Sequence, residues 1–75
     1  MKYLVDYIAR SLVSDPTQVR VETYTRRNSV NIVLHVARED MGRVIGKQGR
    51  VANAIRSLLR VMALRDDVRV NLDIE

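Results

Sequence analysis

The sequence predicts an α+β fold whose elements follow the order helix, strand, strand, helix, helix, strand. Two kinds of pattern support this prediction. Three short segments alternate apolar and polar residues with the period of a half-buried strand, and three others repeat apolar residues with the period of a helix. Because each strand has only one apolar face, the helices should share a single side of a three-stranded mixed sheet.

The helical segments are predicted at residues 3–14, 39–45 and 50–64. The first has one apolar stripe and is stopped by Asp15 and Pro16. The second has about two turns, too few to be stable without packing. The third is the longest, and its apolar arc is wider than one sheet needs. The middle of that arc is formed by Val51, Ile55, Leu59 and Met62.

The strands are predicted at residues 18–25, 30–37 and 68–74, where apolar residues alternate with polar ones. A polar turn at residues 26–29 makes the first two strands an antiparallel hairpin. The pair of helices between the second and third strands should form a right-handed crossover to a parallel strand. The third strand is therefore expected beside the second, with the first strand at the other edge.

The length of 75 residues allows a single domain, residues 1–75, with one small core. Cysteine is absent, which excludes disulfides and thiolate metal sites and suits a reducing cytoplasm. We find no apolar run long enough for a signal peptide or a membrane span. We therefore expect a soluble cytoplasmic protein without a membrane-bound form.

Positive charge is concentrated in one part of the chain. The whole chain carries a net charge of +4, whereas residues 38–65 hold seven Lys and Arg against two acidic residues, a net of +5. The remainder therefore sums to −1. A local excess of this kind is the electrostatic footprint expected for a polyanionic ligand.

Two glycines lie inside this basic segment. Gly46 and Gly49 bracket Lys47 and Gln48, so a short helix should end, turn tightly and restart as a longer helix. The N–H groups of the turn would then lie at the start of the second helix, where the helix dipole and the unpaired donors favour an anion. Positive side chains around that anion come from Arg43, Lys47 and Arg50. The pattern predicts a site for a phosphodiester.

Three other interpretations of the sequence are weaker. A nucleotide-binding P-loop needs a glycine at position 41 and a Ser or Thr at position 48, where this chain has Met41 and Gln48. A simple helix cap needs only one glycine and would leave the clustered charge unused. The sequence shows no set of residues suited to catalysis, because His35 is the only histidine and no nucleophile is paired with it. We predict no catalytic residue, no metal ligand and no cofactor.

The whole chain resembles a KH domain of the type II arrangement. The resemblance rests on residues 44–50, Val-Ile-Gly-Lys-Gln-Gly-Arg, and on the Ala-Ile-Arg sequence at 54–56 in the next helix. Together with the length, this segment is similar to the KhpA family of small bacterial single-KH proteins. The resemblance implies binding of single-stranded RNA, with about four nucleotides clamped along the GxxG turn. It also implies a homodimer and a larger KH-containing partner of the KhpB or Jag type.

The predicted RNA-binding residues combine the turn with its flanking side chains. They are Arg43, Val44, Ile45, Gly46, Lys47, Gln48, Gly49 and Arg50. An aliphatic groove beside the turn is expected to be lined by Val44, Ile45 and Ala54, with Val33 as a further candidate from the central strand. The chain has no Phe or Trp and only three Tyr, which argues against an RNA-binding sheet that relies on stacked aromatic residues.

Ala54, Leu58 and Val61 extend the apolar arc of the longest helix to one side. Either the first helix covers these residues or they form a subunit interface, and their spacing favours the two equally. The family resemblance favours the interface of a homodimer. An alternative function keeps the fold but makes the protein a protein–protein adaptor in which RNA binding is incidental. An adaptor, however, has no need of the GxxG turn.

Overall fold

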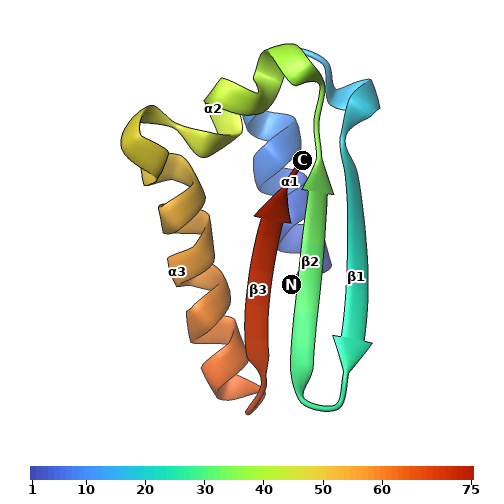
Figure 1. Ribbon diagram of the computed structural model, residues 1–75, viewed down its shortest axis with the longest axis vertical. Helices are drawn as coiled ribbons and strands as arrows, with labels where there is room; N and C mark the ends of the chain where they lie inside the picture. Colours follow the sequence, from blue (N-terminus) through green and yellow to red (C-terminus); the bar gives the residue numbers. More distant parts are fainter.

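Three α-helices and one three-stranded sheet build the protein, as the computed structural model of residues 1–75 shows (Figure 1). Short 3-10 turns η1, η2 and η3 lie between these elements, at Pro16–Gln18, Arg38–Asp40 and Lys47–Gly49. The order of helices and strands confirms the predicted α+β arrangement. The elements are α1 (Lys2–Leu12), β1 (Arg20–Arg26), β2 (Ser29–His35), α2 (Met41–Ile45), α3 (Arg50–Arg65) and β3 (Arg69–Ile74).

The sheet has the strand order β1-β2-β3, which confirms the predicted topology. Strands β1 and β2 are antiparallel and joined by a two-residue turn, since Arg26 pairs with Ser29. Strands β2 and β3 are parallel, and the chain between them passes through α2 and α3. Strand β3 is therefore an edge strand, and α3 runs beside it (Figure 1).

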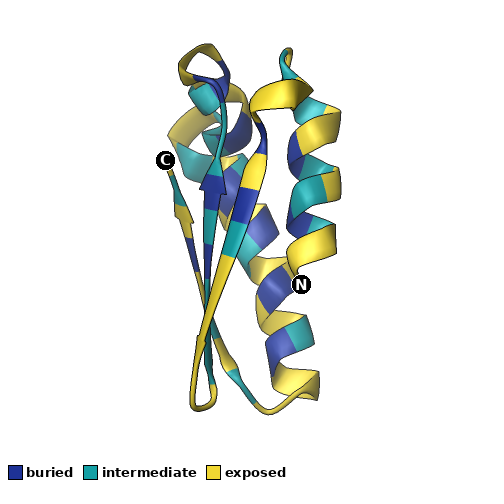
Figure 2. Ribbon diagram, turned by 90° about the vertical axis from the view of Figure 1, so that its right-hand side faces the viewer, coloured by how far each residue is buried: buried dark blue, intermediate teal, exposed yellow.

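Both long helices cover the same face of the sheet and leave the other face open to solvent (Figure 2). Along β2, Ile32 and Leu34 point to the helices and are buried, whereas Asn31, Val33 and His35 alternate with them on the open face. The period of two in the sequence therefore corresponds to burial on one side. None of the helices is both long and apolar enough to cross a lipid bilayer.

The core forms where α1, α3 and the sheet meet. Ile32, Leu34 and Leu59 are its largest buried side chains, each at most 1% exposed. Burial of one such side chain contributes about 1.5–3 kcal/mol to stability. The complete buried cluster consists of Val5, Ala9, Val19, Val21, Ile32, Leu34, Ile55, Leu59 and Leu72.

Four predicted boundaries differ by two residues from the observed ones: the end of α1 at Leu12, the end of β2 at His35, the start of α2 at Met41 and the start of β1, where the cause is visible. The strand begins at Arg20 rather than at residue 18, because Pro16–Gln18 form a 3-10 turn. The Asp15 carboxylate caps this turn by accepting a hydrogen bond from the Thr17 N–H at 3.2 Å. Hydrogen bonds from the Thr17 hydroxyl and the Gln18 amide hold the pKa of Asp15 below its ordinary value. The turn that Asp15 caps therefore includes Gln18 and ends at Val19, two residues that alternation alone assigns to the strand.

Asp40 is the one buried charged side chain, and it holds the segment before α2 in place. Its two carboxylate oxygens accept hydrogen bonds from the backbone N–H groups of Ser14 at 3.0 Å and Asp15 at 3.1 Å. This carboxylate connects the end of α1 to the start of α2, 25 residues or more away in the sequence. The position of α2, and with it the GxxG turn, depends on this contact.

We expect Asp40→Ala to lower the free energy of unfolding by about 2–4 kcal/mol, because two part-buried N–H groups lose a charged acceptor. Urea denaturation followed by circular dichroism measures the change. Glu39→Ala is the matched control, since the adjacent Glu39 is exposed and its side chain accepts no hydrogen bond. Equal unfolding midpoints for the two variants would contradict the structural role of Asp40.

Candidate nucleic-acid interface

The GxxG turn lies between α2 and α3, and three of its residues have positive φ angles. Gly46 ends α2 with φ 77° and ψ 171°, Gln48 adopts φ 57°, and Gly49 precedes α3 with φ 75°. Two N–H groups are used inside the turn: Gly46 donates to the Gly42 carbonyl at 2.9 Å, and Gly49 donates to the Gly46 carbonyl at 3.1 Å. The chain thus stops one helix and starts another within four residues.

The two glycines are needed for different reasons. A Cβ at Gly46 would lie 2.5 Å from Val51 Cγ2 and 2.8 Å from the Val51 backbone nitrogen, so the protein itself fills this space. A Cβ at Gly49 would meet nothing closer than the Asn53 amide nitrogen, at 3.8 Å. Gly46 therefore serves the packing of α2 against α3, whereas the surface over Gly49 is open to another molecule.

The residues between the glycines have exposed side chains and backbone N–H groups without a partner in the turn. Lys47 and Gln48 are the first residues after the capping Gly46, so their N–H groups have no partner within the helix. The side chains of Lys47, Gln48 and Arg50 are exposed around this point. Arg43 is also exposed, although its Nε lies 3.7 Å from Asp40 Oδ1, so part of its charge is balanced. The turn combines free donors with three cations.

A groove begins at the turn and runs between the helices and the edge strand β3. We call this the GxxG groove. Its apolar surface comes from Ile45, Ala52 and Ile74, and its polar rim from Arg56, Asp73 and Glu75. The residues that line it are Ile45, Gly49, Ala52, Arg56, Asp73, Ile74 and Glu75.

This lining corrects two expectations about the groove. The neighbouring strand is β3 and not the central β2, because α3 packs beside the edge of the sheet. Val33 pairs with Glu22 and Asp73 on the open face and is not part of the groove. Ala54 is exposed and does not line it either; Ala52 takes that place.

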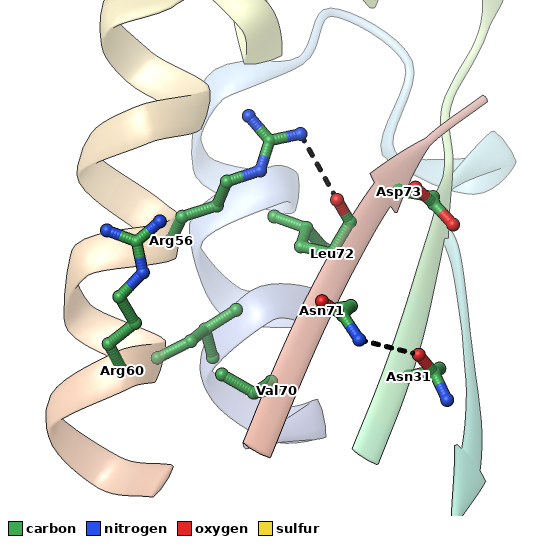
Figure 3. A pocket seen from close by; sticks show the side chains of 8 residues that line it. Asn31, Arg56, Arg60, Val70, Asn71, Leu72 and Asp73 are labelled. Carbon is green, nitrogen blue, oxygen red and sulfur yellow. Dashed lines mark hydrogen bonds between the residues drawn. The ribbon is translucent and has the colours of Figure 1, made fainter. Parts of the chain in front are cut away.

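Ala52, Ile74 and Arg56 were not among the residues predicted for the site. The sequence could have predicted the two residues on α3, because Ala52 and Arg56 are four residues apart and therefore share one helical face just after Gly49. Ile74 has no comparable signal, because only the strand register brings it beside the turn. Arg56 also donates a hydrogen bond from Nη2 to the Leu72 carbonyl at 3.1 Å and thus joins α3 to β3 (Figure 3).

The aliphatic residues before Gly46 have different environments. Ile45 is half-buried and lines the groove. Val44 is fully buried at 0% exposure, so it contributes to the site by holding α2 in place from within. Ile45 can therefore contact a ligand directly, whereas Val44 cannot.

The side of α3 away from the groove carries uncovered apolar residues. Leu58 is 51% exposed, Val61 is 58% exposed and Leu64 is 81% exposed, and Ala54 is exposed beside them. Of the two interpretations of this arc, coverage by α1 is wrong, because α1 packs against the sheet and leaves these side chains in solvent. We call Ala54, Leu58, Val61 and Leu64 the α3 apolar patch.

His35 belongs to a polar cluster on the open face of the sheet. Its Nε2 lies 2.8 Å from Glu22 Oε1. The hydrogen bond from the Tyr24 hydroxyl, with smaller effects of Arg20 and His35, holds the pKa of Glu22 below its ordinary value. No nucleophile joins this cluster, and no group of three or more potential metal ligands occurs in the protein. The cluster stabilises the pairing of β1 with β2.

The six-element order, the mixed sheet with helices on one face and the GxxG turn between two helices define a KH domain of the type II arrangement. Comparison with known families agrees with this class. The chain belongs to the KhpA/KhpB family: the family model described as "KhpA/KhpB, KH domain" matches residues 2–74. Members of this family are not enzymes, which agrees with the lack of a catalytic constellation in the sequence.

Similar proteins match over nearly the whole chain, and three of them, from different bacteria, are each named RNA-binding protein KhpA. The one from Clostridium acetobutylicum is 47% identical over 74 residues, covering 99% of both chains. The one from Halalkalibacterium halodurans is 49% identical, covering 99% of this chain and 97% of the relative. The one from Caldanaerobacter subterraneus subsp. tengcongensis is also 49% identical and covers 99% of both chains.

Proposed function

We propose that this protein binds single-stranded RNA in the GxxG groove and acts as a post-transcriptional regulator or RNA chaperone in the cytoplasm. The observation that carries the proposal is the open surface over Gly49, beside the free N–H groups of Lys47 and Gln48. A sugar-phosphate backbone can reach the N–H groups of the protein main chain only where no side chain lies between them. The names of the relatives, which call them RNA-binding proteins, support the same function.

The mechanism is noncovalent. Phosphates accept hydrogen bonds from the turn N–H groups and are neutralised by Lys47, Arg50 and, in part, Arg43. Unstacked bases enter the groove and pack on Ile45, Ala52 and Ile74. Base edges can form hydrogen bonds with Arg56, Asp73 and Glu75 at the rim. About four nucleotides fill a KH groove, so one domain alone should bind with modest affinity.

The experiment that tests this function is a titration of labelled single-stranded RNA against the wild type and the double variant Lys47→Asp with Gln48→Asp. Circular dichroism checks that the variant remains folded. The adaptor function predicts no change in RNA affinity, because the adaptor surface does not include the turn.

We also propose that the α3 apolar patch is the interface of a homodimer, or of a complex with a larger KH-containing partner. Three large apolar side chains more than half exposed on one helix are unusual for the free surface of a small monomer. Pairing two domains through this patch leaves both grooves accessible and raises avidity for RNA without new contacts to either site.

Val61→Glu is expected to shift the protein towards monomer, because it places a charge in the centre of the α3 apolar patch. Sedimentation velocity over a range of concentrations measures the change. Glu replaces a side chain that is 58% exposed in the free domain, so the circular dichroism spectrum should not change. A wild type that already sediments as a monomer at high concentration would contradict the homodimer.

A further inference from the structure

The two edges of the sheet differ in how far they are covered. At the β3 edge, α3 runs alongside the strand (Figure 1), and Arg56 Nη2 occupies the Leu72 carbonyl at 3.1 Å. At the β1 edge, α1 covers only the beginning of the strand. The half of β1 that leads to the hairpin is exposed, and no helix lies in front of it (Figure 2). The β1 edge is therefore the free edge of the sheet.

The strand register shows which backbone groups of β1 are free. Arg26 and Ser29 close a two-residue turn, so they exchange backbone hydrogen bonds with each other. Because such pairs alternate along an antiparallel ladder, Tyr24 and Glu22 also direct their backbone groups to β2. The residues between them, whose N–H and C=O groups point away from the sheet, are Val21, Thr23 and Thr25. No other hydrogen bond of the protein uses these groups.

This edge lacks the features that usually prevent strand pairing. All seven residues of β1 pair one-to-one with β2, so no bulge bends the strand away. The strand contains neither proline nor lysine, and its exposed Thr23 and Thr25 are β-branched residues that favour extended backbone. An uncovered edge of this kind is a template for a further β-strand.

The side chains of β1 are complementary to a second copy of the same strand. If two copies pair antiparallel with Tyr24 opposite Tyr24 of the second copy, two-fold symmetry places Glu22 of each copy opposite Arg26 of the other. Opposite charges and facing aromatic rings are both favourable cross-strand pairs. In this register Thr23 lies opposite Thr25 of the second copy, so the free N–H and C=O groups of both residues find partners.

The neighbouring registers are less favourable. A displacement towards the start of β1 places Arg20 opposite Arg26 of the second copy, and a further one places Glu22 opposite Glu22, so like charges face each other. A displacement towards the hairpin leaves only Thr25 to form backbone hydrogen bonds before the turn. Arg26 has no ion pair within its own chain, so its charge is free for the second copy.

We infer that the free edge of β1 pairs antiparallel with β1 of a second copy, so that two sheets join into one. This surface is separate from the α3 apolar patch and from the GxxG groove, which lie with α3 and β3 at the other side of the sheet (Figure 1). The inference does not depend on RNA binding. A chain that uses both the β1 edge and the α3 apolar patch assembles beyond the dimer, and its grooves remain accessible.

The test exchanges the charges of the cross-strand pairs, with Val61→Glu in every protein so that the α3 apolar patch does not contribute. The parent Val61→Glu protein should form a weak, concentration-dependent dimer in sedimentation velocity, because the contact is small. Glu22→Arg and Arg26→Glu should each raise the dissociation constant at least about tenfold, since two attractive pairs become repulsive. An equimolar mixture of these two variants should associate as the parent does, because every cross-strand pair is then again opposite in charge.

Two further measurements locate the contact. Thr23→Pro removes an N–H group that points away from β2, so it should abolish the dimer and leave the circular dichroism spectrum unchanged. In nuclear magnetic resonance spectra of the parent, the amide signals of Thr23 and Thr25 should shift with concentration. Glu39→Arg and Arg65→Glu are the matched controls, with the same changes of charge at exposed positions outside β1.

A parent protein that stays monomeric at every concentration would overturn the pairing of two copies and leave the edge to a strand of another protein. A mixture of Glu22→Arg and Arg26→Glu that remains monomeric would overturn it too, as would equal losses in the two controls. None of these results bears on the GxxG groove, whose failure is recognised from the RNA titration of the Lys47→Asp, Gln48→Asp variant.

Discussion

The double variant Lys47→Asp with Gln48→Asp is expected to lose at least about 100-fold in affinity for single-stranded RNA, roughly 2.7 kcal/mol. Both side chains are exposed, and both residues offer the free N–H groups to which we assign phosphate binding. Two carboxylates at this point repel the phosphates that the turn would otherwise attract. Fluorescence anisotropy with a labelled RNA, at one stated salt concentration, measures the loss.

The fold should tolerate this double substitution. Lys47 makes no ion pair, and aspartate is among the residues that tolerate the positive φ of 57° at position 48. Circular dichroism and the urea midpoint should therefore stay close to the wild-type values. A control with the same change in charge is Lys2→Asp with Ser11→Asp, at exposed positions of α1. Wild-type RNA affinity in the turn variant would contradict the RNA-binding function and favour the adaptor.

Gly46→Ala is expected to destabilise the protein by about 2–4 kcal/mol, because a β-carbon collides with Val51 in an already unfavourable conformation. The nearest contacts would be 2.5 Å to the Val51 side chain and 2.8 Å to its backbone nitrogen, and the backbone cannot move without shifting α3. A domain of 75 residues has roughly 4–11 kcal/mol of stability in total. The substitution should therefore lower the urea midpoint by a large fraction.

The other two glycines provide the controls for this prediction. Gly42→Ala lies in α2 with nothing within 4 Å of its new Cβ, so it should be neutral or stabilising by up to about 1 kcal/mol. Gly49→Ala should destabilise by about 1 kcal/mol through its φ of 75° and yet weaken RNA binding strongly, since its methyl group occupies the open surface. The same urea midpoint for Gly46→Ala and Gly42→Ala would show that contact with Val51 does not prevent a side chain at position 46.

Most of the fold could be predicted because each element carries a local periodic signal. The alternation in β2 and β3 and the helical spacing of α3 locate the observed elements to within two residues, and the strand order follows from the parallel crossover. The start of β1 could not be predicted from alternation, because the side chain of Asp15 closes a 3-10 turn in its place. In the sequence Asp40 is only one more charge of the basic segment, although two backbone groups far away along the chain depend on it.

The turn was also predicted from a local pattern, because two glycines around two polar residues between helical segments indicate a tight turn that ends one helix and starts the next. The groove was not predicted as accurately. Its wall is β3 rather than β2, and Ile74 and Ala52 line it where Val33 and Ala54 were expected. The uncovered α3 apolar patch was one of two open alternatives, and only the packing of α1 decided between them.

The sequence by itself determined the order of the elements, the one-sided sheet and the GxxG turn, because periodicity, helix termination and glycine conformation are properties of neighbouring residues. Only the tertiary structure decided which strand faces the turn, which alanine lines the groove and whether the α3 apolar patch is covered. These features depend on how helices and sheet pack together, and residues brought together in that way carry no common signal along the chain.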